Sequence, residues 1–331
     1  MLQTPELKPY FFTPVAIKPE RTGKLSRQRL LSGKCGKLRI TIEVVTLTHI
    51  GSGKLIYRES DQAFIHKLAR VDDVIALPGS GFKGMLRAVF EAVSESCIPL
   101  YPKPEDFEDI IPSNDANLTK CSINSLCPAC SLFGCQSARG KLGFSSFRLE
   151  SGDSASLTDE YTLPDLHSPT VTEYGRKFYR HSRHIILDDT GKEEYRDIPE
   201  CIKPEREDRD IYECLKPGSK LTGEIIYQGL TPDEFGGLLF ALGLGWGKRI
   251  YFKMGYAKPA YLGSVSLCVQ QVKLPDRYNA EPDQNLEILA GNYYAAHRKN
   301  IQETVDTLSE AWAEIGDTSS WTRGKSGKLG Y

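Results

Sequence analysis

The 331-residue sequence has no long apolar run. Residues 1–30 lack the uninterrupted hydrophobic stretch of a signal peptide, and no later segment approaches the roughly 18 apolar residues that a membrane span needs. We therefore expect a cytoplasmic protein without a membrane partner. Because cytoplasmic thiols are kept reduced, the nine cysteines favour metal ligation or ordinary burial over disulfides.

The sequence also lacks an excess of charge of either sign, with a formal net charge of −1 at pH 7. The overall charge therefore does not indicate a nucleic-acid partner, but two local segments do. Residues 18–39 are strongly basic, with Glu20 as their one acid. Residues 174–184 interleave cations with aromatic rings: Arg176, Lys177, Phe178, Tyr179 and Arg180. Cations suit phosphates and flat rings suit unstacked bases, so these segments favour single-stranded RNA, with a solvated surface as the alternative.

The hydrophobic periodicity predicts an α+β fold. Period-two alternation predicts a first strand at 38–48, and helical spacing predicts a helix at 82–95 after a long loop. Strands in 140–150 and 219–230, a helix at 231–245 and a strand at 261–274 follow. The order strand, helix, strands, helix, strand is that of a ferredoxin-like or RRM-like domain, here with large insertions.

We predict one elaborated domain. Residues 38–275 form it, and they include a zinc segment at about 121–135 and a polar insertion at about 150–217. Residues 1–37 are a basic N-terminal arm, and residues 276–331 contain a C-terminal helix and a basic tail.

Four closely spaced cysteines predict a zinc site. Cys121, Cys127, Cys130 and Cys135 follow the spacing C-x5-C-x2-C-x4-C, and the central pair can present two thiolates to one tetrahedral ion. Four ligands leave no open position, so the site is expected to be structural. Cys97 or His167 can replace one outer ligand. The alternative is a set of buried or free thiols.

Two glycine-rich stretches carry cations. "LPGSGFKGMLRAVF" sets Lys83 and Arg87 at the N-terminal part of the helix at 82–95, where unpaired N–H groups favour an anion. "KMGYAKPAYLGSV" sets Lys258 between glycines just before a strand. Each stretch fits contact with a phosphate, and each also fits a plain glycine-marked turn.

These stretches stand in one order with "TLTHIGSG", "CPACSLFG", "GRKFYRHS" and "LTPDEFGGLLFALGLG". The ordered set resembles the RAMP superfamily of CRISPR-associated proteins, most closely the backbone-type subunits of type III effector complexes, the seventh Cas family. The resemblance implies a modified RRM-like fold that lies along CRISPR RNA beside other subunits of the complex. It also implies that part of 150–217 reaches a neighbouring subunit. The expected RNA path is formed by His49, Gly51, Gly53, Lys83, Arg87, Arg176, Lys177, Phe178, Tyr179, Arg180 and Lys258.

The resemblance further implies that Asp61 supports cleavage of target RNA with Mg²⁺ or Mn²⁺, which aligns the ribose 2′-hydroxyl and stabilises charge on the phosphate. His66 is a second candidate acid or base, and Asp72 and Asp73 fit turn positions. Two alternatives remain. One is a scaffold subunit that binds RNA without cutting it. The other is an endoribonuclease that processes CRISPR RNA, for which the sequence shows no evident catalytic histidine pair.

Overall fold

The computed structural model describes residues 10–14, 19–21, 23, 33–97, 121–150, 157–162, 175–181, 185–187, 193–195, 210–272 and 285–313. The strands are β1 (Tyr10–Thr13), β2 (Lys34–Val44), β3 (Gly51–Arg58), β4 (Ala63–Leu68), β5 (Arg70–Val71), β6 (Val74–Leu77), β7 (Gly134–Cys135), β8 (Ala138–Arg139), β9 (Leu142–Phe144), β10 (Phe147–Leu149), β11 (Thr158–Thr162), β12 (Arg176–Tyr179), β13 (Ile185–Leu187), β14 (Glu193–Tyr195), β15 (Ile211–Leu215), β16 (Lys220–Leu230), β17 (Phe252–Lys253) and β18 (Ser264–Val272). The helices are α2 (Gly79–Ala92), α4 (Pro128–Phe133), α6 (Pro232–Ala241) and α7 (Leu286–Ala313), with a 3₁₀ turn η2 (Lys258–Ala260). Within this part of the chain, no helix combines the length and the hydropathy that crossing a bilayer requires.

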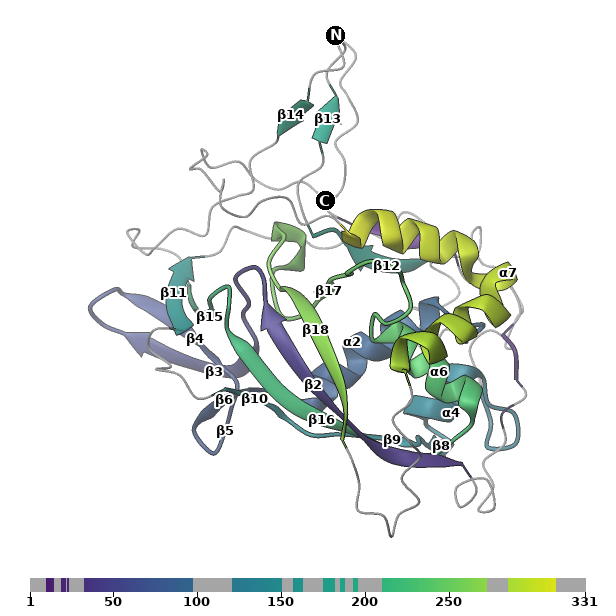
Figure 1. The fold of residues 1–331 in the computed structure, drawn as a ribbon. Helices are drawn as coiled ribbons and strands as arrows, with labels where there is room; N and C mark the ends of the chain where they lie inside the picture. Colours follow the sequence, from purple (N-terminus) through teal and green to yellow (C-terminus); the bar gives the residue numbers. More distant parts are fainter. Residues whose placement is uncertain are drawn as a thin grey trace, which may run out of the picture.

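The main sheet has the strand order β17-β18-β2-β16-β10-β6-β5, with β9 also paired to β16 (Figure 1). Strand β2 is antiparallel to both β16 and β18, and β16 is antiparallel to β10. Helix α2 lies in sequence between β2 and β10, and α6 lies between β16 and β18. The order β18-β2-β16-β10 is the split βαβ arrangement of ferredoxin-like domains. The strand and helix order that the sequence predicted is therefore confirmed.

Local sequence explains the two best-predicted elements. Strand β2 buries Leu38, Ile40, Ile42 and Val44 on one face, as period-two alternation requires. Helix α6 begins with a capping box, because the Thr231 hydroxyl accepts from the Glu234 N–H and the Glu234 carboxylate accepts from the Thr231 N–H.

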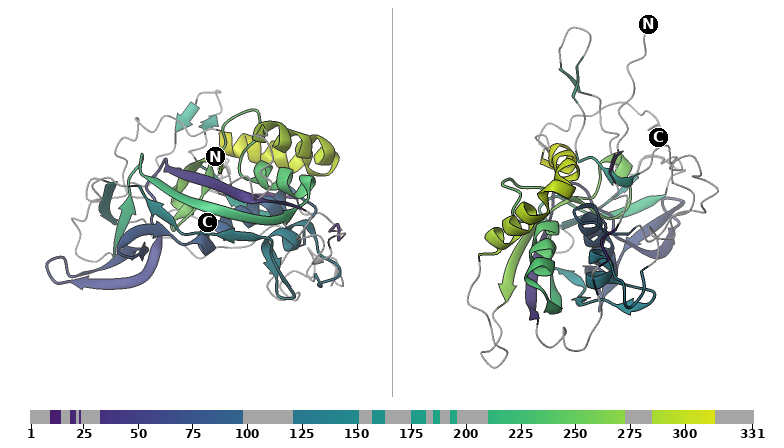
Figure 2. Two further views of the ribbon diagram at one scale, coloured as in Figure 1. Left: turned by 60° about the horizontal axis from the view of Figure 1, so that its bottom comes forward. Right: turned by 90° about the vertical axis from the view of Figure 1, so that its right-hand side faces the viewer.

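The helices gather on one side of the sheet (Figure 2). Helix α6 contacts both α2 and α7, so it lies between them. Phe82 and Leu86 of α2 are fully buried, and the Tyr293 hydroxyl of α7 donates to the Val93 carbonyl at 2.8 Å. Helix α7 is therefore part of the core and not an appendage.

The segment between β2 and α2 differs from the predicted long loop. It forms β3, β4, β5 and β6, and β3 and β4 pair as a hairpin that projects at the left of Figure 1. Every residue of β3 before Arg58 is exposed, so its side chains show no alternation that a sequence pattern can detect. The loop prediction was wrong for this reason.

A second sheet joins this hairpin to the insertion, in the order β11-β15-β4-β3. Strands β4 and β15 are parallel, with Tyr212 opposite His66. Strands β13 and β14 form a separate antiparallel pair. Much of 150–217 lies outside the described residues, and so does His167.

Part of the predicted basic arm belongs to the core. Strand β1 pairs with β12, and Phe11 stacks on Phe178 with ring centroids 6.1 Å apart. The indole of Trp312 meets Phe178 edge-on at 5.2 Å. Strand β12 is thus held between the N-terminal strand and α7.

We expect acid to destabilise the fold through His181. Its side chain is 1% exposed, and burial, followed by the nearby Lys253 charge, holds its pKa well below 6.5. Below about pH 6.5 the unfolded chain binds a proton that the folded chain does not, so stability falls as the pH falls, by up to about 1.4 kcal/mol per pH unit for this group. Thermal unfolding from pH 8 to pH 5 measures the effect.

The matched variant is His181→Gln, which removes the titrating group. Its stability difference from the wild type should be constant between pH 7 and pH 8 and should shrink below pH 6.5. A difference that stays constant down to pH 5 would contradict the prediction.

Candidate functional site

A cavity of about 900 Å³ opens between the β2–β3 connection, α2, β12 and the chain from β17 to η2. Its volume lies in the range of ligand-binding sites. Seven residues predicted for the RNA path line it: His49, Gly51, Gly53, Lys177, Phe178, Tyr179 and Lys258. Segments more than two hundred residues apart in the chain thus meet at one site.

Two of the glycine-marked stretches are joined directly. The backbone carbonyl of His49 accepts a hydrogen bond from the Tyr256 N–H at 2.9 Å. Gly255 has φ +80°, and a Cβ at this position would lie 2.4 Å from the His49 oxygen. Only glycine allows this approach. At Gly53, with φ +77°, nothing lies within 4 Å of the Cβ position, so the backbone is open to a ligand.

His49 is fixed as a neutral acceptor. Its Nδ1 lies 2.7 Å from the Glu213 carbonyl oxygen, so Nδ1 carries the proton and Nε2 has the lone pair. Burial lowers the pKa of His49, which is 3% exposed, and keeps the ring uncharged at neutral pH. The rings of His49 and His66 lie 6.4 Å apart between centroids. No histidine pair was evident from the sequence, because the antiparallel pairing of β3 with β4 brings together two histidines that are 17 positions apart in the chain.

Two lysines of the cavity have lowered pKa values. Burial lowers the pKa of Lys258, because water solvates its charged ammonium group poorly at this position. Burial and the neighbouring Lys258 charge lower the pKa of Lys253, whose Nζ donates to the Leu262 carbonyl at 2.9 Å. An anion in the cavity would relieve both effects.

Arg87 and Arg176 were predicted for the RNA path, but the structure engages both inside the protein. Arg87 Nε donates to Glu91 Oε1 and a terminal nitrogen of Arg176 donates to Glu91 Oε2, each at 2.7 Å. Arg87 also donates to the Gly134 carbonyl, and Arg176 donates to the carbonyls of Ser96 and Cys97. These contacts use the guanidinium donors that an RNA phosphate would need, so both residues have a structural role.

Of the other predicted residues, Lys83 and Arg180 lie outside the cavity lining. Lys83 is half-buried on α2, and the side chain of Phe178, 8% exposed, packs in the core, although Phe178 borders the cavity. The Arg180 guanidinium lies over the Phe11 ring at 5.1 Å, and burial lowers its pKa. Tyr179 keeps partial exposure beside Lys177, whose ammonium lies 3.8 Å from the Tyr10 ring centroid. The sequence offers Phe178 or Tyr179 as a platform for a base; the burial of Phe178 argues against that ring, whereas Tyr179 is partly exposed.

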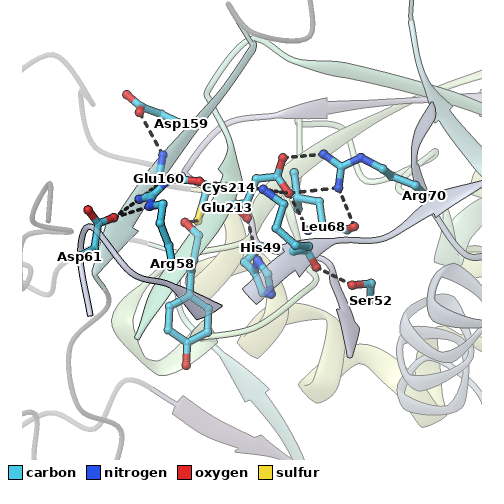
Figure 3. A network of polar contacts seen from close by, with 12 residues as sticks. His49, Ser52, Arg58, Asp61, Leu68, Arg70, Asp159, Glu160, Glu213 and Cys214 are labelled. Carbon is cyan, nitrogen blue, oxygen red and sulfur yellow. Dashed lines mark hydrogen bonds and ion pairs between the residues drawn. The ribbon is translucent and has the colours of Figure 1, made fainter. Parts of the chain in front are cut away.

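Asp61 lies at the tip of the β3–β4 hairpin, away from the cavity lining. Figure 3 shows its carboxylate paired to Arg58, which also donates to Glu160 at 2.8 Å. This bond to Glu160 raises the pKa of Arg58 and outweighs the cost of burial. Lys67 and Arg70 continue the network to Glu213, at 3.3 and 2.5 Å.

The described residues around Asp61 do not fit a preformed site for Mg²⁺ or Mn²⁺. The Arg58 guanidinium bonds to both Asp61 and Glu160, so a cation already holds the two carboxylates. We therefore derive no step through such an ion. Asp72 and Asp73 have φ of 51° and 61° in the turn between β5 and β6, which confirms them as turn residues.

A cysteine cluster lies where the chain that follows α2 approaches the start of α4. The thiols of Cys97, Cys121, Cys127 and Cys130 lie within 4.8 Å of one another, and they are the group that the described part of the chain offers to a metal ion. Cys127 caps α4, where its Sγ accepts from the Cys130 N–H. Hydrogen bonds from Cys130 and Cys97 lower the pKa of Cys127.

The spacing of the sulfurs fits tetrahedral zinc. Cys97 Sγ lies 3.6 Å from Cys130 Sγ and 3.5 Å from Cys127 Sγ. With Zn–S bonds near 2.3 Å, the edge of a sulfur tetrahedron is about 3.8 Å, far longer than a disulfide bond. Cys97 takes the place that the primary prediction gave to Cys135. The Cys135 thiol remains adjacent, 3.3 Å from the Ser137 hydroxyl.

A family model described as the RAMP superfamily matches residues 41–325. No curated protein matches the chain. A solved structure with similarity to it is titled "Cryo-EM structure of the Type III-B Cmr-beta bound to cognate target RNA". The match has 12% identity and a TM-score of 0.39, and it covers 72% of this chain and 61% of that chain, less than two thirds of the latter. Because the family match spans most of its length, the chain belongs to the RAMP superfamily.

Proposed function

We propose that this protein is an RNA-binding backbone subunit of a type III CRISPR complex. The observation that carries the proposal is the convergence of His49, Gly51, Gly53 and Lys258 on one cavity. Open glycine backbone lets a phosphate approach closely, and Lys258 supplies a charge that burial leaves without solvent. Lys177 and Tyr179 of β12 extend the same lining.

Complex assembly is the second part of the proposal. CRISPR RNA and target RNA are the nucleic-acid partners, and related CRISPR-associated subunits are the protein partners. Within the insertion, the antiparallel pair of β13 and β14 is the candidate element for reaching a neighbouring subunit. Strand pairs of this kind suit contacts between chains because their edges offer unpaired backbone groups.

We also propose that the cysteine cluster holds a structural zinc ion. The four thiols of Cys97, Cys121, Cys127 and Cys130 would fill its coordination sphere, so it would tie the end of α2 to α4 without activating water.

Cleavage of target RNA at Asp61 stays a prediction from the family resemblance. A second candidate activity is favoured by one observation, the His49–His66 pair beside the cavity. Neutral His49 has the acceptor needed to take the 2′-hydroxyl proton while the 2′-oxygen bonds to phosphorus and the bond from phosphorus to the 5′-oxygen breaks. The leaving 5′-oxygen would take a proton from His66 or from water, so the products are a 2′,3′-cyclic phosphate and a 5′-hydroxyl, and no metal is needed.

We expect RNA binding to depend steeply on salt and to weaken in Lys258→Met. Each lost phosphate contact reduces the slope of log K against log salt by about 0.7 for a single strand. Titrating the full chain with single-stranded RNA at four salt concentrations measures both quantities. Lys248→Met, at an exposed position outside the cavity lining, is the matched control. Salt-independent binding by the wild type would contradict the RNA interface.

Metal analysis tests the cysteine cluster. We expect about one zinc per chain, retained in Cys135→Ser and in Cys268→Ser but lost in Cys97→Ser, because Cys97 belongs to the group of four and Cys268 is exposed elsewhere. Zinc loss should lower the melting temperature, since metal binding is linked to folding. Loss in Cys135→Ser with retention in Cys97→Ser would restore the ligand set expected from spacing.

The two cleavage predictions differ in whether the cut requires a metal ion and in the chemical groups left at the ends of the RNA fragments. In the assembled complex, Asp61→Asn should abolish one cut that requires Mg²⁺ or Mn²⁺ while RNA binding persists. His49→Gln should instead abolish any cut that survives EDTA and leaves a 2′,3′-cyclic phosphate. If both variants give the wild-type fragment pattern, the subunit is a scaffold.

A further inference from the structure

Three aromatic rings from three parts of the chain form a stacked column. The rings of His66 and Tyr212 lie 4.2 Å apart with an interplanar angle of 7°. Tyr212 and Tyr256 lie 5.3 Å apart at 10°. His66 comes from β4, Tyr212 from β15, and Tyr256 from the connection between β17 and η2. Tyr212 therefore stands in the middle, with His66 and Tyr256 at the two ends.

His49 braces this column from the side. Its ring meets His66, Tyr212 and Tyr256 edge-on, at interplanar angles of 88°, 86° and 84°. The bond between His49 Nδ1 and the Glu213 carbonyl holds the bracing ring, and the His49 carbonyl holds the backbone of Tyr256. The column is thus fixed before any ligand arrives, which reduces the entropy lost on binding.

One end of the column is open. The Tyr256 side chain is 44% exposed although its backbone is tied down, and it lines the cavity with His66 and Tyr212. At the other end, His66 Nε2 bonds to Asp210 at 3.0 Å. Gly53 and Lys258 border the same cavity, so a flat ring and a phosphate site lie side by side. Together they match the two parts of a nucleotide.

We propose that the exposed face of Tyr256 is a stacking platform for an unpaired RNA base, which extends the His66–Tyr212–Tyr256 column by one ring. This inference rests on the proposed RNA-binding function and adds the residue that receives a base. It places the platform on Tyr256, which is 44% exposed, in place of the predicted Phe178 or Tyr179, of which Phe178 is 8% exposed. The stacking is tolerant of sequence, since every base has a π-face.

The test uses the full chain and single-stranded RNA with one 2-aminopurine at successive positions, whose fluorescence falls when it stacks. Tyr256→Ala should weaken RNA binding by about 5- to 150-fold and abolish the quenching at one position. The salt slope should remain that of the wild type, because no phosphate contact is lost. Tyr256→Phe keeps the ring and should behave as the wild type does.

Tyr57→Ala is the matched control, because Tyr57 is a 52% exposed ring on β3 outside the cavity lining. Circular dichroism and melting temperature show whether Tyr256→Ala keeps the fold; if it does not, Tyr256→Leu, which keeps apolar bulk but has no π-face, decides the question by the same loss of quenching. Adenosine monophosphate is the second probe. Competition by this free nucleotide would support a pocket that takes a nucleotide on its own. Protein-dependent quenching that the free nucleotide does not reverse would support a platform that takes a base only as part of an RNA strand.

Two results would overturn the inference, and they are distinguishable. Salt-dependent RNA binding that is equal in the wild type and Tyr256→Ala, without quenching at any position, would remove the platform and leave the RNA interface intact. Absence of RNA binding by the wild type would remove the proposed function and the platform together.

Discussion

The buried carboxylate of Glu91 holds together the parts of the molecule on which the cavity depends. It is 6% exposed, and it accepts from Arg87 of α2 and Arg176 of β12. An ionised carboxylate without partners would cost several kcal/mol at this depth, so removing either arginine would destabilise the other two groups. Arg176 also binds the Cys97 carbonyl. One charge cluster therefore fixes β12, α2 and the cysteine cluster relative to one another.

The net positive charge of the Glu91, Arg87 and Arg176 cluster suits its position next to the cysteine thiols. Two guanidinium groups face one carboxylate, which leaves an excess of positive charge in a region shielded from water. Arg87 reaches Cys130 Sγ at 3.7 Å, and its bond to Glu91 keeps its pKa raised in spite of burial. Four thiolates around Zn²⁺ carry a net charge of −2. If the cluster holds zinc as proposed, that site and the arginine pair would stabilise each other, and loss of one would weaken the other.

The sequence predicted the elements whose signals are local. Period-two burial in β2 and the capping box at Thr231 depend on neighbouring residues, so both were found. Cys97 was only an alternative ligand because the approach of the α2 end to the α4 segment, not spacing, brings it to the cluster. The aromatic column was missed for the same kind of reason. Strands β15 and β4 pair in parallel, which places Tyr212 opposite His66 although a long insertion separates the two residues in the chain.

Arg87, Arg176 and Lys258 differ in what their side chains contact around the cavity and the neighbouring core. The guanidinium groups of Arg87 and Arg176 each satisfy several fixed acceptors at once, which their planar fork of donors permits. Lys258 presents a compact charge in the cavity, and burial lowers its pKa. A flexible ammonium can follow a phosphate whose position varies with the bound strand, whereas a bidentate arginine would favour one geometry. At these three positions the arginines therefore belong to a rigid frame and the lysine to an adaptable surface, which is the arrangement that the proposed binding of RNA without sequence preference would require.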